Sequence, residues 1–122
     1  PRQRGAEGLG SDGMSEASMN KEDAEHIFGT KKASKVLEKH IEQALVRRVM
    51  ELNGTCEKFT SPGRRSVPDR IVTLPGGRII FVECKAPGKK PTITQQFDHE
   101  RRRLLGCDVR VIDNIEKVRG FK

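Results

Sequence analysis

The sequence predicts an α/β fold with elements in the order α-β-β-β-α-β and a short C-terminal helix. From Ala33 to Leu52, apolar residues recur every three or four positions, which is the spacing of one helix face. Two apolar runs, Arg70–Leu74 and Arg78–Lys85, flank a Pro-Gly-Gly sequence and predict a β-hairpin. Thr92, with Gln95 three residues later, has the form of a capping box and predicts the start of a second helix.

The first helix and the segment after it have recognisable ends. Asn53 and Gly54 stop the helix, and Gly54 suits the left-handed conformation that commonly follows a helix. Thr55 to Thr60 predicts a short, polar strand. Ser61 to Ser66 is rich in Pro, Gly and Ser and predicts a loop.

The second helix has an apolar side and a clear stop. We expect a rigid basic loop from Ala86 to Pro91, then a helix to about Leu105 that ends at Gly106. Its apolar side would contain Ile93, Phe97 and Leu104. Asp108–Ile112 predicts the last strand and Asn114–Val118 the terminal helix.

The N-terminal segment has a different composition from the rest of the chain. Residues 1–32 contain almost no branched apolar side chains, so we predict a disordered tail. Met14 and Met19 are both plausible native starts, and the residues before them would then be a remnant. The folded domain is expected to be residues 33–122.

Positive charge is concentrated in the expected domain. Residues 33–122 hold 19 Lys and Arg against 11 Asp and Glu, whereas residues 1–32 hold five and six. Such a balance indicates a polyanionic partner, with a well-solvated surface as the alternative. The five Phe and the absence of Tyr and Trp disfavour stacking on single-stranded bases and favour recognition of duplex backbone or shape.

Cysteine usage and hydropathy exclude several classes. Cys56, Cys84 and Cys107 are widely spaced and have no C-x-x-C pattern, so neither a zinc site nor a disulfide framework is indicated. We expect buried thiols in a reducing compartment, the cytoplasm of a bacterium or a phage-infected host. No apolar run approaches the roughly 20 residues of a membrane span, and no signal peptide is evident. Neither a membrane nor a small-molecule substrate is expected as a partner.

Two acids and a lysine are placed to converge at one end of the predicted hairpin. Side chains alternate along a strand, so Glu83 and Lys85 share a face, and Asp69 stands at the start of the adjacent strand. The two carboxylates and the Cys84 main-chain carbonyl are oxygen ligands of the kind that Mg²⁺ or Mn²⁺ prefers. The lysine could hold a water and offset charge on a phosphate. A Glu-x-Lys sequence by itself is more often an ordinary surface pair.

A longer set of motifs resembles a known family. Asp69 together with Glu83-Cys84-Lys85 resembles the signature of the PD-(D/E)xK nuclease superfamily. The chain from about residue 40 to 119 is similar to the virus-type replication-repair nuclease (VRR-NUC) domain, most of all its stand-alone phage and prophage members. The similar strings are 41–49, 58–71, 74–78, 81–91 and Gln95. The resemblance implies a restriction-endonuclease-like core.

The resemblance also implies a role for each matching residue. Asp69 and Glu83 match the family's metal-ligand pair, with the Cys84 carbonyl as a further ligand. Lys85 matches the catalytic lysine. Glu42 matches the acid on the first helix that approaches the metal directly or through water.

Two of these matches have rivals, and two positions depart from the family pattern. Glu38, one turn before Glu42, is the competing helix acid. Gln95 matches the glutamine that closes the site, and Gln96 is its rival; Gln95 could also be only a capping partner. Cys84 stands where the family often has Leu or Val, and we expect little effect because its side chain faces the other side. Ser66 stands where the family favours Gly, and we expect the serine to stiffen the loop.

Basic groups on both sides of the expected site could contact phosphates. We expect Arg101–Arg103 to be mainly a solvated helix face. His26, His40 and His99 form no triad. His99, one helical turn past Gln95, is expected to be a surface residue, with a place in the lining of the site as the alternative. The DNA-binding candidates are Lys58, Arg64, Arg65, Arg70, Lys89 and Lys90.

The function that the resemblance implies is a Mg²⁺- or Mn²⁺-dependent endodeoxyribonuclease. By similarity to stand-alone members, we expect a homodimer that cuts branched duplex DNA, such as four-way junctions or flaps, in phage replication, recombination or repair. The alternatives are a sequence-specific restriction-type endonuclease and a DNA-binding module without catalysis.

Overall fold

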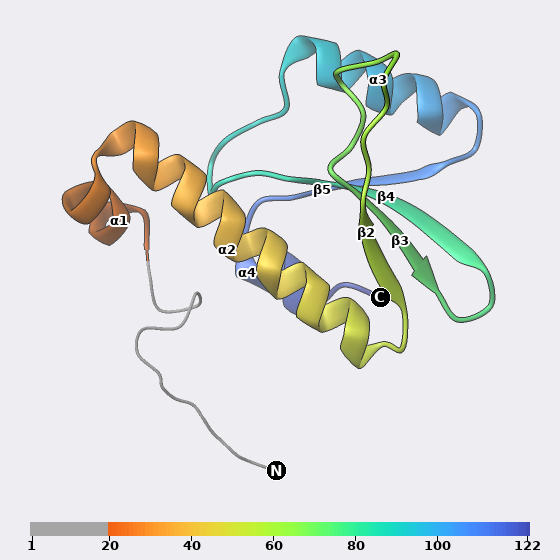
Figure 1. Cartoon of the computed structure of the whole chain (residues 1–122), viewed down its shortest axis with the longest axis horizontal. Coiled ribbons are helices and arrows are strands. Elements are labelled where there is room, and N and C mark those ends of the chain that lie inside the picture. Colours follow the sequence, from red (N-terminus) through yellow and green to blue (C-terminus); the bar gives the residue numbers. More distant parts are fainter. Residues whose placement is uncertain (1–19) are drawn as a thin grey trace.

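A computed structural model describes residues 20–122 as one mixed sheet covered by helices on both faces (Figure 1). The strands follow the order β2-β3-β4-β5 in a four-stranded sheet. The elements are α1 (Lys21–Phe28), α2 (Thr30–Glu51), β2 (Thr55–Lys58), β3 (Arg70–Leu74), β4 (Arg78–Cys84), α3 (Ile93–Leu104), β5 (Asp108–Ile112) and α4 (Ile115–Arg119). The predicted α/β fold and element order are confirmed for 33–122.

The sheet combines two antiparallel pairs with one parallel pair. β2 pairs with β3 and β3 with β4 in antiparallel register, and Leu74 lies opposite Arg78 in the predicted hairpin. Gly76 and Gly77 both have positive φ in its turn, at 90° and 78°, which side chains disfavour. β5 runs parallel to β4, with Ile80 opposite Asp108. A parallel pair needs a crossover connection, and α3 provides it.

The apolar core lies on one face of the sheet, under α2 and α4. Ile41, Leu45 and Val49 form the buried side of α2, as the helical spacing predicted. They pack with alternate residues of β4, and that set is Ile80, Val82 and Cys84. Because successive side chains of a strand point to opposite faces, the intervening Phe81 and Glu83 face α3.

The N-terminal prediction is wrong for residues 20–32. Asn20 caps α1 by accepting a hydrogen bond from the Asp23 backbone, and the start of α2 follows Gly29. Ala24 of α1 is fully buried in a small cluster with Ala33, Leu37 and Ala86. Alanines give little hydrophobic signal in a sequence, yet their small size lets two helices approach closely. Residues 1–19, including both candidate start methionines, lie outside the described part of the chain.

The end of α2 also differs from the prediction. The left-handed residue is Asn53, with φ of 63°, and not Gly54. Gly54 is needed for a different reason, because a Cβ there would lie 2.5 Å from the Thr73 carbonyl oxygen and 2.8 Å from Leu74 Cδ2. The glycine therefore lets the chain pass close to β3 as it turns from α2 into β2.

Helix α3 begins and ends as predicted. The Thr92 Oγ1 accepts from the Gln95 backbone N–H at 3.2 Å, and the Gln95 Oε1 accepts from the Thr92 N–H at 2.9 Å. These two bonds complete the capping box. Gly106, with φ of 94°, follows the last turn.

The prediction that an apolar side of α3 packs on the sheet is wrong. Ile93, Phe97 and Leu104 are 70%, 72% and 80% exposed, whereas Asp98 and His99 are buried against the sheet. The reason is the polar character of the sheet face beneath, where a buried Glu83 needs polar neighbours. In the described part of the chain, no helix has the length and apolar character to cross a membrane.

Candidate active site

The predicted carboxylates meet where β4 ends beside the start of β3. Asp69 immediately precedes β3, and its Oδ2 accepts a hydrogen bond of 2.8 Å from the Cys84 backbone N–H. Glu83 is the neighbouring residue of β4, and Lys85 follows the strand. The hairpin thus places Asp69 beside the Glu83–Cys84 peptide, as the sequence predicted.

Glu83 is the most constrained of these groups. Its carboxylate is only 2% exposed, and its Oε2 accepts a 3.0 Å bond from Gln95 Nε2 and lies 3.6 Å from Lys85 Nζ. Its Oε1 is buried without a hydrogen-bond partner, as is the facing His99 Nε2 at 3.9 Å. One side of the carboxylate is therefore held by the protein while the other remains unsatisfied.

Asp69, Glu83 and Lys85 form what we call the catalytic cluster. The electrostatics of this cluster favour an added positive charge. Burial, followed by the negative charge of Asp69, raises the pKa of Glu83 to about 8 although Lys85 opposes the shift. Burial also raises the pKa of Asp69, against the lowering effect of the hydrogen bond from Cys84. Both carboxyls would ionise more readily beside a cation.

The donor set fits a hard divalent cation that keeps water ligands. Among the described residues, no three His, Cys, Asp or Glu side chains come together as a metal-binding group. A cation here would use Asp69, the unsatisfied Oε1 of Glu83 and the Cys84 carbonyl. Mg²⁺ commonly binds through one or two carboxylates, waters and substrate phosphates, so this set suits it better than a closed all-protein site.

The two acids of α2 have different surroundings. Glu42 Oε2 forms a 2.7 Å ion pair with Arg70 Nε, and Arg70 also donates to the Cys56 carbonyl at 3.2 Å. Glu38, one turn earlier, has a pKa raised first by burial and then by the negative charge of Asp69, while Lys85 opposes the shift. Both acids therefore lie within the electrostatic field of Asp69, since Glu42 also raises the pKa of that carboxyl, and they differ in that Glu42 is paired with Arg70.

The contacts of Gln95 and Gln96 also distinguish the two candidate glutamines. Gln95 completes the capping box with its Oε1 and holds Glu83 with its Nε2, so one side chain does both. Gln96 instead donates to the Pro91 carbonyl at 2.9 Å, in an exposed position.

The predicted DNA-contacting residues divide into two sets. Arg70 is turned inward, with a side chain only 14% exposed, and Arg64 reaches Asp98. The other members, Lys58, Arg65, Lys89 and Lys90, are exposed around the site.

Two residues of α3 differ from their expected surface positions. His99 is 1% exposed rather than a surface residue. Arg102 is no part of a solvated face, because it donates to Asp98 at 2.7 Å and lies over the rings of Phe59 and Phe81. The i, i+4 spacing of Asp98 and Arg102 was the available signal for this pair.

Comparison with known proteins finds a phage protein and a solved structure that the chain covers over most of their length. No family model matches it. A protein of Acyrthosiphon pisum secondary endosymbiont phage 1, named "Putative nuclease p44", is 54% identical over 79 residues, which are 65% of this chain and 85% of the phage protein.

A solved structure agrees with that similarity. A chain described as a VRR_NUC domain superposes with a TM-score of 0.65 at 34% sequence identity, covering 68% of this chain and 90% of that one. The fold, the acid and lysine positions and both similarities lead to one conclusion. The chain belongs to the VRR-NUC family, in its phage type, and has the restriction-endonuclease-like fold of that family.

Proposed function

We propose that this protein is an endonuclease that hydrolyses phosphodiester bonds in DNA with the help of Mg²⁺ or Mn²⁺. The observation that carries the proposal is the gathering of Asp69 and Lys85 beside Glu83, a buried carboxylate whose Oε2 is held by the protein and whose Oε1 has no hydrogen-bond partner. A pure DNA-binding module would gain nothing from acids facing phosphates. The nuclease name of the phage relative supports the same activity.

Each residue has a distinct task in this proposal. Asp69, Glu83 and the Cys84 carbonyl would hold the cation, which supplies an activated water and stabilises charge on the phosphate. Lys85, whose Nζ lies 3.6 Å from Glu83 Oε2, orients the attacking water and offsets negative charge that develops on the phosphate oxygens. Gln95 fixes the orientation of Glu83 through its 3.0 Å hydrogen bond.

An acid of α2 is proposed to approach the cation as well. Glu42 was expected in this role, and its ion pair with Arg70 leaves it an indirect contact through water. Glu38 lies in the electrostatic field of Asp69 and Lys85, and we propose it as the acid that faces the cation.

The substrate is proposed to be branched duplex DNA, such as a four-way junction or a flap. Exposed Lys58, Arg65, Lys89 and Lys90 border the site and suit phosphates of duplex arms. A role in phage replication, recombination or repair, inside the cytoplasm of the host cell, would follow from such a substrate.

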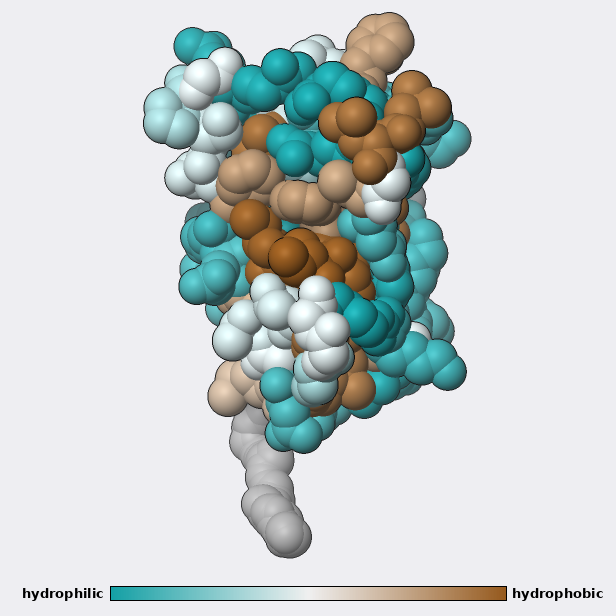
Figure 2. All heavy atoms as spheres, turned by 90° about the vertical axis from the view of Figure 1, so that its right-hand side faces the viewer, coloured by the Kyte–Doolittle hydropathy of each residue, from teal (hydrophilic) through white to brown (hydrophobic). Residues whose placement is uncertain are grey.

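We propose that two copies of the chain form the working enzyme. Figure 2 shows apolar surface gathered on the face that carries the β3–β4 turn and the α3–β5 connection. Ile79, Leu104 and Leu105 are 54%, 80% and 75% exposed, and a groove of about 560 Å³ lies beside Ile79 between the start of β4 and Gly106–Asp108. A second copy would cover these side chains, and a two-fold axis would present two sites to two strands.

A cleavage assay tests the activity. A labelled panel of four-way junction, flap, duplex and single strand should be cut only with Mg²⁺ or Mn²⁺, with a preference for branched DNA. Asp69→Ala, Glu83→Ala and Lys85→Ala should each lower the rate at least about a hundredfold. Arg119→Ala, an exposed change on α4, is the matched control.

Three results would contradict the proposal. Undiminished cutting by all three variants would exclude this site, and metal-independent binding without product would indicate a DNA-binding module. A discrete band pattern on plasmid DNA would indicate a restriction-type endonuclease instead.

A further inference from the structure

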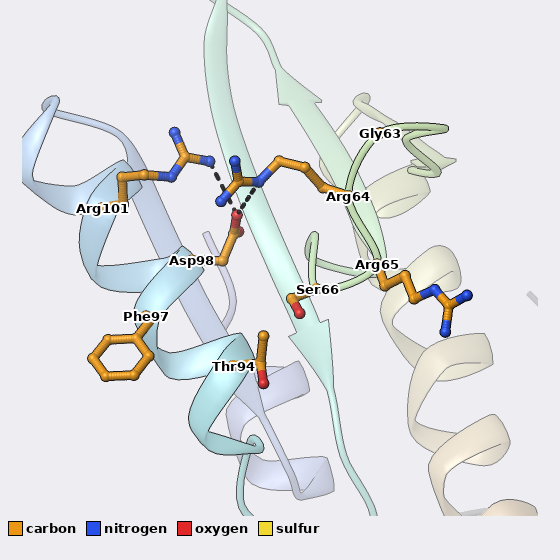
Figure 3. Close-up of a pocket in the computed structure, with 8 residues that line it drawn as sticks. All are labelled: Gly63, Arg64, Arg65, Ser66, Thr94, Phe97, Asp98 and Arg101. Atoms are coloured by element: carbon orange, nitrogen blue, oxygen red, sulfur yellow. Dashed lines mark hydrogen bonds and ion pairs between the residues drawn. The ribbon is translucent and has the colours of Figure 1, made fainter.

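A second site lies beside the catalytic cluster, between the 61–66 loop and α3. It is a pocket of about 400 Å³, large enough for a phosphate with part of its sugar. Residues 63–66 form one wall, and the other wall is made by Thr94, Phe97, Asp98 and Arg101 (Figure 3). The sequence prediction of DNA contacts included the loop arginines but no residue of α3.

The base of the pocket is an Asp98 carboxylate that is 2% exposed and surrounded by arginines. Arg102 Nε lies 2.7 Å from Oδ2, and Arg101 Nη2 lies 3.1 Å from Oδ1. Arg64 Nε lies 3.6 Å from the same Oδ1, beyond hydrogen-bond length. Three guanidinium groups thus share one carboxylate, and the cluster keeps a net positive charge.

That excess charge faces the pocket. Arg102 is directed inward, with a side chain 14% exposed, whereas Arg64 and Arg101 are 55% and 45% exposed. Figure 3 shows these two side chains extending from opposite walls toward Asp98, while Arg65 points away. A guanidinium has five N–H donors, so each retains several for a ligand.

The pocket is attached to the catalytic cluster through both of its walls. On the loop, Ser66 is three residues before Asp69, whose carboxylate binds the Cys84 N–H. On α3, Thr94 precedes Gln95, which binds Glu83. The Ser66 and Thr94 hydroxyls, drawn lower in the same pocket in Figure 3, can add neutral donors to an anion.

We propose that this pocket binds one backbone phosphate of the DNA, next to the phosphate that is cut. Arg64 and Arg101 would clamp it from two elements, and Asp98 would position both guanidinium groups. Because Arg64 is held to Asp98 only by a long ion pair, the phosphate can take over its free donors without breaking a hydrogen bond. This inference rests on the proposed nuclease function, since it needs DNA that passes the catalytic cluster.

The salt dependence of DNA binding tests the proposal. Binding of the full chain to labelled junction and duplex DNA is measured by anisotropy across a salt series, in Ca²⁺ and in EDTA, and DNA integrity is checked on a gel. Log Kobs falls with log salt in proportion to the number of phosphates neutralised. The Arg64→Ala/Arg101→Ala double variant should lower the steepness by about 0.9, the value of one phosphate.

Matched variants separate the phosphate contact from a general effect. Arg64→Lys and Arg101→Lys keep the charge and should keep most of the slope. Arg119→Ala removes an exposed arginine of α4 and should leave the slope unchanged. Thermal unfolding of each variant verifies that it is folded, and Arg102 still holds Asp98 in the double variant.

A neutral methylphosphonate, moved along the strand around the cut position, locates the contact. One position should weaken wild-type binding by about tenfold. The double variant should lose almost nothing further there, because the same contact is already absent.

Two outcomes would overturn the inference. One is an unchanged salt slope in a folded double variant, and the other is a double variant as sensitive as the wild type at every methylphosphonate position. Either result together with normal metal-dependent cutting would refute the pocket alone. A reduced slope in a protein that never cuts DNA would refute the nuclease function alone.

Discussion

At the scale of single residues, the two oxygens of Glu83 have different surroundings. Gln95 and Lys85 occupy the space around Oε2, while Oε1 is buried and unsatisfied. An unpaired buried carboxylate oxygen is costly, and proteins usually keep one only where a ligand will meet it. The protein thus holds one oxygen, and the other is the one that the proposed cation would meet.

The acids of α2 give the sharpest residue-level prediction. Glu38→Gln should reduce cleavage by roughly a hundredfold and leave the melting temperature nearly unchanged, because this acid lies in the field of Asp69 and Lys85. Glu42→Gln should act mainly on stability, by about 1–2 kcal/mol, because it removes the charge that pairs with Arg70. Single-turnover cleavage and thermal melts of both variants measure the two effects. If Glu42→Gln abolished cleavage and Glu38→Gln changed only stability, Glu42 would be the acid that approaches the cation.

Gly54 provides a second test, of packing rather than chemistry. Gly54→Ala should lower the free energy of unfolding by about 1–3 kcal/mol, since its Cβ would lie 2.5 Å from the Thr73 carbonyl oxygen. Gly63→Ala is the matched control, because no atom lies within 4 Å of a Cβ there. Urea unfolding of both variants measures the difference. Equal stabilities would mean that α2 and β3 can separate at little cost.

At the scale of elements, α3 is attached to the sheet by charge more than by apolar contact. Its buried residues are Asp98 and His99, while its large apolar residues are exposed. Arg102 links Asp98 to the Phe59 and Phe81 rings of the sheet side. The ionised Asp98 therefore supports α3 by holding Arg102 over these rings.

This attachment predicts acid sensitivity. Burial alone would raise the pKa of Asp98, but hydrogen bonds and positive charge from Arg102 and Arg101 outweigh it and lower the pKa below 3.8. A lowered folded-state pKa means stability that is present above the unfolded value and is lost as the pH falls through the folded value. Asp98→Asn should be less stable than the wild type at neutral pH, by about 1–3 kcal/mol, and the gap should shrink below pH 3.8. Chemical unfolding across pH 2–7 measures the gap, and a constant gap would contradict the assignment.

The same elements explain what the sequence could and could not predict. The β3–β4 hairpin and the capping box of α3 depend on neighbouring residues, so local patterns were sufficient for them. The buried side of α3 was missed because its partner, Glu83, comes from a strand more than ten residues earlier. Helix α1 was missed because alanine contacts, such as Ala24 with Ala33, have little hydropathy contrast. For the site, Asp69, Glu83, Lys85 and Gln95 were predicted together, while the environments of Glu38 and Glu42 required coordinates.

At the scale of the whole molecule, the exposed apolar face predicts an assembly. Leu104→Glu with Leu105→Glu should shift the proposed dimer to a monomer, because charges would be placed on the face that a second copy would cover. The monomer should then no longer cut the two opposing strands of one junction together. Light scattering after size-exclusion chromatography measures the mass. Met50→Glu, at a residue 67% exposed on α2, is the control, and a wild type that elutes as a monomer would refute the dimer.

The crossover that makes β4 and β5 parallel has a consequence for the partly folded chain. The cluster needs a residue from β4, one preceding β3 and one from α3, and α3 lies in the connection that returns the chain to place β5 beside β4. A chain that has formed only the β3–β4 hairpin would hold Asp69 and Glu83 without Gln95. We therefore expect DNA cutting only from a chain in which α3 has also packed on the sheet.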